Sequence, residues 1–241
     1  MAIDTSQGPA IARVQRVIED LVPSWLHRLP FSRRFLFSTR TRPVRNWIFQ
    51  QLVKLSIAEH VDVDNLVFVD SDVAFVRSFD PEMLIRDGKL RLFRAPGAAR
   101  LETHFRWHRS AAGLLGLEER DYLGADFIGN LITWRRKHVL DLHRRIEDVS
   151  GTSWQRAIAR TWHLSEYILY GAFVEQLLEG GSHYYTSESL CQISWEYQVD
   201  DLASLERVFS EIRPEHVAIM VDAKLAIPAT HYEPLLATVP R

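Results

Sequence analysis

An apolar run that ends in two acids is the feature that most constrains this chain. Residues 66–70 read LVFVD, and Asp72 follows two positions after Asp70. An unbroken apolar run of this length is typical of a strand covered on both faces, as in a parallel sheet. Open α/β sheets bind ligands just beyond the carboxyl ends of such strands. The run therefore predicts a ligand site at Asp70 and Asp72.

The two carboxylates favour a divalent cation as that ligand. At positions i and i+2 of an extended chain, side chains point to the same side. Hard oxygen ligands suit Mg²⁺ or Mn²⁺ held jointly with a diphosphate, and the cation would neutralise charge on a departing nucleoside diphosphate. Two surface acids that cap a turn are one alternative. A haloacid-dehalogenase-type phosphatase with Asp70 as nucleophile is another, although the Gly-Asp pair of its metal motif is absent from the sequence.

Strands and helices are expected to alternate along the rest of the chain. Further strands are predicted at 90–94, 126–134 and 217–222, and helices at 10–22, 46–60, from 135 to about 147, 152–162, 165–179 and 202–212. This alternation favours an α/β fold with a mixed, mostly parallel sheet. We divide the chain into a helical segment, 1–23, and a single domain, 24–241, whose first residues to 45 are expected to be irregular.

Composition argues against several classes of function. The formal net charge of -2 provides no general basic field for nucleic acid. A single cysteine, Cys191, excludes an internal disulfide. No apolar run approaches the roughly 20 residues that span a bilayer, and residues 1–10 do not resemble a signal peptide, so a cytoplasmic location is expected. Residues 31–49 mix Phe and Trp with five arginines, which leaves peripheral contact with a membrane surface open.

Three segments together carry a resemblance to a known family. Residues 50–55 read QQLVKL, residues 66–80 read LVFVDSDVAFVRSFD, and residues 162–171 read WHLSEYILYG. Over roughly residues 45–222 the chain resembles nucleotide-sugar glycosyltransferases of the GT-A type. It is most similar to a bacterial family of proposed glycosyltransferases whose function is unknown. The resemblance implies a GT-A-like domain that moves a sugar from a nucleoside-diphosphate sugar to an unknown hydroxyl acceptor, with Mn²⁺ or Mg²⁺ as cofactor.

The resemblance also implies roles for individual residues. Glu166 would be the base that deprotonates the acceptor hydroxyl. Tyr170 is expected to share the helix face of Glu166, which should look toward Asp72 across a gap of one sugar ring. The candidate set is Glu166 and Asp126 as catalytic residues, Gln50, Lys54, Asp70 and Asp72 for the donor, Asn130 and Tyr170 for the acceptor, and Asp70, Asp72 and His231 for the metal.

The chain departs from the GT-A pattern at its beginning. GT-A domains open with a strand and a Gly- or Thr-bearing turn that hold the nucleotide base, whereas no buried strand is evident before residue 65. The N-terminus is expected to be helical instead. This departure supports an alternative function, that of a non-catalytic GT-A-like module that works as a homo-oligomer or as a partner subunit.

Overall fold

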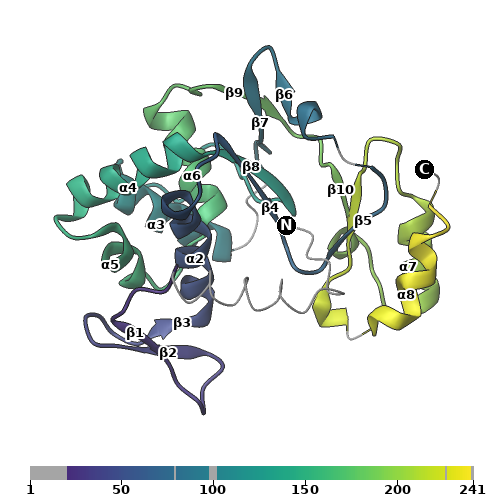
Figure 1. Cartoon of the computed structure of the whole chain (residues 1–241), viewed down its shortest axis with the longest axis horizontal. Coiled ribbons are helices and arrows are strands. Elements are labelled where there is room, and N and C mark those ends of the chain that lie inside the picture. Colours follow the sequence, from purple (N-terminus) through teal and green to yellow (C-terminus); the bar gives the residue numbers. More distant parts are fainter. Residues whose placement is uncertain (1–20, 79, 98–101, 226, 240–241) are drawn as a thin grey trace.

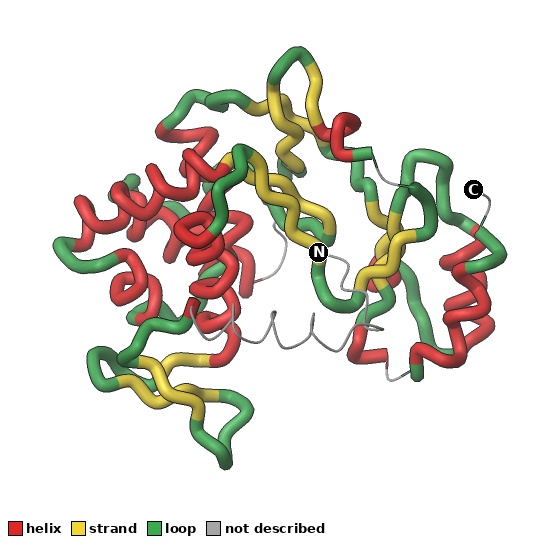
Figure 2. Tube along the Cα trace, in the orientation of Figure 1, coloured by secondary structure: helices red, strands yellow, loops and turns green. Residues whose placement is uncertain are grey.

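Short strands and longer helices alternate along the chain, which gives a mixed α/β fold (Figures 1 and 2). The structure, a computed structural model, describes residues 21–78, 80–97, 102–225 and 227–239. The predicted helix at 10–22 and nearly all of the segment 1–23 lie outside the described residues.

Seven α-helices form within these ranges. They are α2 (Asn46–His60), α3 (Glu102–Leu115), α4 (Arg136–Ser150), α5 (Trp154–Ala159), α6 (Glu166–Leu177), α7 (Leu202–Ser210) and α8 (Ala229–Leu236). Short 3₁₀ helices lie at Pro81–Leu84, Ser194–Glu196 and Ala223–Leu225. The strands are β1 (Leu26–Arg28), β2 (Phe35–Ser38), β3 (Val44–Arg45), β4 (Asn65–Val69), β5 (Val73–Phe75), β6 (Ile85–Arg86), β7 (Lys89–Phe93), β8 (Leu131–Arg135), β9 (His183–Thr186), β10 (Cys191–Ile193) and β11 (Ala218–Met220).

The strands form several small sheets. β1, β2 and β3 make an antiparallel sheet, and β4 pairs antiparallel with β8. β7 lies between β6 and β9, and β11 lies between β10 and β5. Among the described strands only the pairs β7–β9 and β10–β11 run parallel. The prediction of a mixed sheet is therefore confirmed, and the prediction that it is mostly parallel is wrong.

Strand β4 differs from the strand that its sequence predicts. Leu66 is buried, but Val67 on the opposite face is 36% exposed, although Val69 on that face is partly buried, so the strand is not fully covered on both faces. The partner of β4 is the antiparallel β8, where Trp134 stands opposite Leu66 and is completely buried. Antiparallel pairs commonly pack one face on the core and leave the other face exposed to solvent. No other described strand pairs with β4.

Two further predictions are corrected in detail. The strand expected at 126–134 begins only at Leu131, because Asp126 makes just an isolated bridge with Ala95 and its carboxylate then accepts a hydrogen bond from the Ile128 N–H at 2.9 Å. Such an Asx turn competes with strand pairing. The stretch 24–45, expected to be irregular, contains the sheet β1–β2–β3. The predicted helices from 46–60 onward are present with small shifts at their ends.

The core is built in separate parts. Helices α2 to α6 gather on one side of β4 and β8 and share a large apolar cluster that includes Leu52, Trp134 and Tyr170. On the other side, β5, β10 and β11 pack with α7 and α8 around clusters that include Met220 and Phe209 (Figure 1). The turn between β4 and β5 crosses from one part to the other. No described helix is both long and apolar enough to cross a bilayer.

Candidate functional site

The Asp70-Ser71-Asp72 segment forms the tight turn that connects β4 to β5. The Val73 N–H donates to the Asp70 carbonyl at 3.2 Å, and the Val221 N–H donates to the Asp72 carbonyl at 3.0 Å. The two acids therefore sit on a turn and not on an extended chain, which corrects the geometry assumed from their spacing. The turn still places both carboxylates at the end of a strand, where the two parts of the fold meet.

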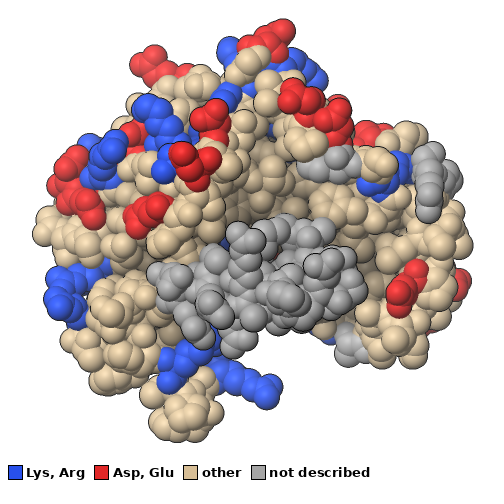
Figure 3. Space-filling view, viewed as in Figure 1, with Lys and Arg blue, Asp and Glu red and all other residues tan. Residues whose placement is uncertain are grey.

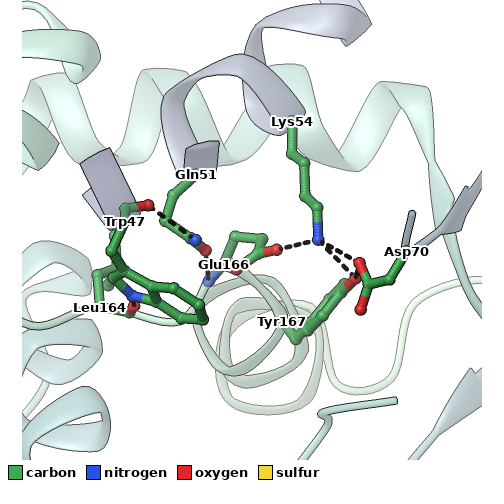
Figure 4. Close-up of polar contacts among 7 residues, drawn as sticks. All are labelled: Trp47, Gln51, Lys54, Asp70, Leu164, Glu166 and Tyr167. Carbon is green, nitrogen blue, oxygen red and sulfur yellow. Dashed lines mark hydrogen bonds and ion pairs between the residues drawn. The ribbon is translucent and has the colours of Figure 1, made fainter. Parts of the chain in front are cut away.

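A lysine from α2 organises the Asp70 side of this turn (Figure 4). The Lys54 ammonium lies 3.0 Å from Asp70 Oδ1, 2.8 Å from Glu166 Oε1 and 2.7 Å from the Tyr167 hydroxyl. An ammonium has three N–H donors, so these contacts use all of them. The Tyr167 hydroxyl in turn donates to Asp70 Oδ1 at 3.2 Å. Three elements, α2, β4 and α6, are thus tied together at one charged centre.

The Asp70 carboxylate is held at one oxygen and open at the other. Oδ1 accepts hydrogen bonds from both Lys54 and Tyr167, while Oδ2 has no hydrogen-bond partner among the described residues. The Asp70 side chain is 31% exposed. A partly exposed carboxylate that is fixed through one oxygen and unpaired at the other is already oriented to bind a cation or a hydroxyl group.

Glu166 begins helix α6 and lies deep behind the lysine. Its side chain is only 2% exposed, and its backbone N–H donates to Gln51 Oε1 at 3.1 Å. Gln51 thereby satisfies an N–H that the first turn of a helix leaves unpaired, and its own amide donates to the Trp47 carbonyl at 3.0 Å. The Trp47 indole donates to the Leu164 carbonyl at 2.6 Å. Helix α2 therefore fixes the start of α6 through both charge and hydrogen bonds.

The charges at this centre shift one another. Burial alone would lower the pKa of Lys54, but Glu166, Tyr167 and Asp70 outweigh it and raise that pKa well above the usual 10.5. Burial raises the pKa of the Tyr167 hydroxyl, with a further contribution from Glu166, so the hydroxyl stays protonated and donates. Burial also raises the pKa of the Glu166 carboxyl, which Lys54 opposes. We assign the positive charge to Lys54 because three oxygens surround it.

Acidic groups gather around the Asp72 side of the turn. The pKa of Asp72 is raised, first by partial burial and then by the charges of Asp70 and Asp222, against hydrogen bonds that include one from the Ala223 backbone. Asp222 follows β11, and its N–H donates to Ser194 Oγ at 2.9 Å. Burial, then Asp72 and Asp70, raise the pKa of the Cys191 thiol to about 12, so this cysteine is an inert, packed side chain. Uncompensated negative charge of this kind favours a bound cation.

The structure brings together three of the predicted site residues. Lys54, Asp70 and Glu166 share the charged centre, and Asp72 is in the same turn. Glu166 does not face Asp72 across an open gap, as was expected, because it is buried against Lys54. The Asp70 N–H donates to the Asn130 carbonyl at 3.4 Å, which places that residue beside the turn. The buried side-chain oxygen of Asn130 has no hydrogen-bond partner among the described residues.

Other predicted residues lie apart from this centre. Tyr170 is completely buried, stacks on Trp134 with ring centroids 4.8 Å apart, and accepts a hydrogen bond from the Arg135 N–H at 2.8 Å. Gln50 is exposed on α2 and His231 is exposed on α8. Asp126 is buried and pairs with His104, whose Nδ1 lies 2.9 Å from the carboxylate.

The described residues do not complete a metal site by themselves. Within the described ranges, no group of three or more His, Cys, Asp or Glu side chains is arranged to hold an ion, so His231 does not join Asp70 and Asp72. Two acids that leave the remaining positions to water and phosphate oxygens are, however, a common way to bind Mg²⁺. Cavities of 380 Å³ and 280 Å³ lie elsewhere, one beside β1 and β2 and one between α4 and α5.

Comparison with known proteins places the chain in a family. The model of the Family of unknown function (DUF6492) matches residues 10–206, which is most of the chain. The chain belongs to this family. No curated protein matches it. The charged centre of Lys54, Asp70, Glu166 and Tyr167 lies entirely within the part that the DUF6492 model matches.

Two contributors to the centre of this DUF6492 member were missed by sequence reasoning. Neighbouring residues on a helix point in different directions, yet at the first turn of α6 both Glu166 and Tyr167 reach Lys54. Asp222 could have been found from the sequence. Residues 217–222 read VAIMVD, an apolar run that ends in an acid, as residues 66–70 do at Asp70. Only the structure shows that these two strand ends influence the same carboxylate.

Proposed function

We propose that this chain is a metal-dependent glycosyltransferase of the GT-A type, which transfers a sugar from a nucleoside-diphosphate sugar to a hydroxyl acceptor. The observation that carries the proposal is the Asp70 carboxylate, fixed through Oδ1 by Lys54 and Tyr167 and open at Oδ2, in one turn with Asp72. The resemblance of the three sequence segments to GT-A enzymes supports the same reaction.

In this proposal Asp70 and Asp72 hold Mg²⁺ or Mn²⁺ together with the donor diphosphate. The excess negative charge around Asp72 is what a divalent cation would neutralise, and the cation would in turn stabilise the departing diphosphate. Lys54 sets the orientation of Asp70, because its three N–H groups are already committed to the protein.

Glu166 takes a positioning role in this proposal in place of the role of base. A base must reach the acceptor proton directly or through one water, whereas Glu166 is 2% exposed and contacts Lys54. Asp126 stays a predicted catalytic residue, but its carboxylate lies apart from the charged centre, with His104 Nδ1 at 2.9 Å.

Calorimetry with nucleoside diphosphates tests the proposal directly. UDP, GDP, ADP and CDP are titrated into the protein with Mn²⁺, with Mg²⁺ and with EDTA, and we expect one of them to bind only when the metal is present. Asp72→Asn should abolish that binding and leave the folded state intact. Asp148→Asn, at an exposed position of α4, is the matched control. Binding that is unaffected by EDTA or by Asp72→Asn would contradict the metal site.

A second candidate function rests on a different observation. β4 pairs with β8 alone among the described strands, so no described strand offers the base-binding platform that opens a GT-A domain. This favours a non-catalytic GT-A-like module that acts with a partner subunit or a second copy. Incubation with the nucleoside-diphosphate sugar distinguishes the two functions. A transferase slowly transfers the sugar to water and releases nucleoside diphosphate, whereas a binding module does not.

A further inference from the structure

The region before and within α2 is strongly basic although the chain as a whole is not. Residues 21–58 contain six arginines and Lys54, with no Asp or Glu, while the formal net charge of the whole chain is -2. Cationic charge is therefore concentrated in this region and balanced elsewhere. A local basic surface on a neutral protein points to an anionic partner at that surface.

Five of the six arginines of this region are exposed on a projecting sheet and its loops. The sheet β1–β2–β3 stands out from the body at the lower left of Figure 1, below α2. Arg28, Arg33, Arg34, Arg40 and Arg42 are exposed, and none of them forms an ion pair with a described acid. Figure 3 shows Lys or Arg side chains at this end of the molecule, with no Asp or Glu side chain in view there.

Large apolar side chains project beside these arginines. Phe31, in the loop from β1 to β2, is 85% exposed, and Phe37 on β2 is 49% exposed. A phenylalanine at the tip of a loop gains nothing in water, but it buries its ring when it enters an apolar phase. Apolar side chains flanked by arginine are the composition of surfaces that lie in a membrane interface.

A cavity in the same sheet adds a place for an anionic group. It has a volume of 380 Å³, and its lining includes Arg28, Ser32, Arg33 and Asn46. The guanidinium of Arg28 is held 5.2 Å from the centre of the Phe49 ring. Guanidinium groups bind phosphate through paired hydrogen bonds. A lipid phosphate therefore fits beside the loop that carries Phe31.

We propose that the sheet β1–β2–β3 docks on an anionic membrane surface, with Phe31 and Phe37 entering the interface and the arginines contacting lipid phosphates. Nucleic acid fits these observations less well, since it offers no apolar phase in which the exposed Phe31 could be buried. The membrane proposal does not depend on the glycosyltransferase proposal, because it uses none of the residues around Asp70.

Vesicle flotation tests this proposal. The full chain is mixed with phosphatidylcholine vesicles, with and without phosphatidylglycerol, at low and at high salt. We expect the protein to float only with the anionic vesicles and less at high salt. Arg33→Glu with Arg34→Glu should weaken binding at least about 25-fold, since each arginine near an anionic surface contributes about fivefold. Phe31→Ser should weaken binding at either salt concentration.

Matched controls distinguish docking through this sheet from non-specific electrostatic or hydrophobic binding to vesicles. Arg207→Glu and Trp195→Ser change an exposed arginine and a 52% exposed aromatic in the C-terminal part, and both variants should float like the parent protein. Thermal melting confirms that each variant is folded. Parallel titrations use inorganic phosphate and a single-stranded RNA. Absence of flotation with anionic vesicles, equal flotation of the Arg33/Arg34 variant, or binding of phosphate or RNA without vesicle binding would each overturn the proposal.

Discussion

The Lys54 ammonium lies 2.8 Å from the Glu166 carboxylate, and the Glu166 side chain is only 2% exposed. Removing a carboxylate from water is expensive, and an ammonium in contact with it repays that cost only while both partners remain. Because Lys54 also contacts Asp70 and Tyr167, the pair joins the buried start of α6 to the partly exposed turn after β4. The stability of the fold and the geometry of the proposed site therefore depend on the same contact.

A double-mutant cycle on this pair should show strong coupling. Lys54→Met leaves Glu166 buried without a counterion and should lower the free energy of unfolding by about 3 kcal/mol, the low end for a broken buried pair, since the Lys54 side chain is 26% exposed. Glu166→Gln keeps the shape of the side chain and should cost about 1 kcal/mol. The double variant should be more stable than Lys54→Met alone, as measured by urea denaturation. Additive losses would show that the two residues are not coupled.

Tyr167 and Tyr170 offer a matched pair in which the same atom is removed at two places. Tyr167→Phe removes a hydrogen bond to Asp70 Oδ1 and should weaken metal-dependent nucleotide binding by about tenfold, as loss of a charged hydrogen bond does. Tyr170→Phe leaves the Arg135 N–H without an acceptor and should cost about 1–2 kcal/mol of stability with unchanged affinity. Calorimetry and denaturation measure the two effects. The reverse pattern would place the site at Tyr170.

The sequence was most informative where a local pattern is enough to determine structure. The helical spacing of residues 46–60 predicts α2 and its buried face, and the apolar run 66–70 predicts β4 and the acids that follow it. Strand direction was not predictable, because it depends on the partner. The partner of β4 is the antiparallel β8, with the buried Trp134 opposite Leu66, and nothing within residues 66–70 indicates that partner or its direction.

Stability should fall steeply in mild acid because of buried histidines. Burial lowers the pKa of His108 to about 4 and that of His183 to about 3, from the usual 6.5. Between these values and 6.5 the unfolded chain binds protons that the folded chain cannot, so stability is full above pH 6.5 and is lost as pH falls. Each histidine contributes a slope of up to about 1.4 kcal/mol per pH unit. Urea denaturation at several pH values measures it.

His108→Asn tests the source of that slope. The Asn oxygen can accept the hydrogen bond that His108 Nδ1 accepts from the Leu123 N–H, so the local fold is retained while the titrating group is removed. The variant should be less stable than the parent at neutral pH, because it fills less of the core, but it should lose less on acidification. An unchanged dependence on pH would exclude His108 as a contributor.

The candidate site was predictable only as far as single residues. The sequence predicts Lys54, Asp70 and Glu166 as site residues, but it predicts that Glu166 acts on the acceptor hydroxyl and that Lys54 binds the donor. The sequence could not show that the two side chains meet, because they are 112 positions apart and the contact depends on how α6 packs against α2. Because of that contact, our proposal makes Glu166 a positioning residue in place of the predicted base.

The last prediction concerns Gly171, where α6 passes close to the loop before β8. A Cβ at this position would lie 2.1 Å from the Phe127 ring, and Phe127 is itself 1% exposed, so neither group can move away easily. Gly171→Ala should therefore lower the free energy of unfolding by about 1–3 kcal/mol, the usual cost of overpacking a core, although alanine is the better helix former. Gly113→Ala in α3 is the control, because a Cβ there would meet no atom within 4 Å. It should stabilise the protein by about 0.5–1 kcal/mol through helix propensity alone. The urea denaturation midpoints of the two variants should shift in opposite directions. A stabilising Gly171→Ala would show that Phe127 does not pack against the backbone of α6.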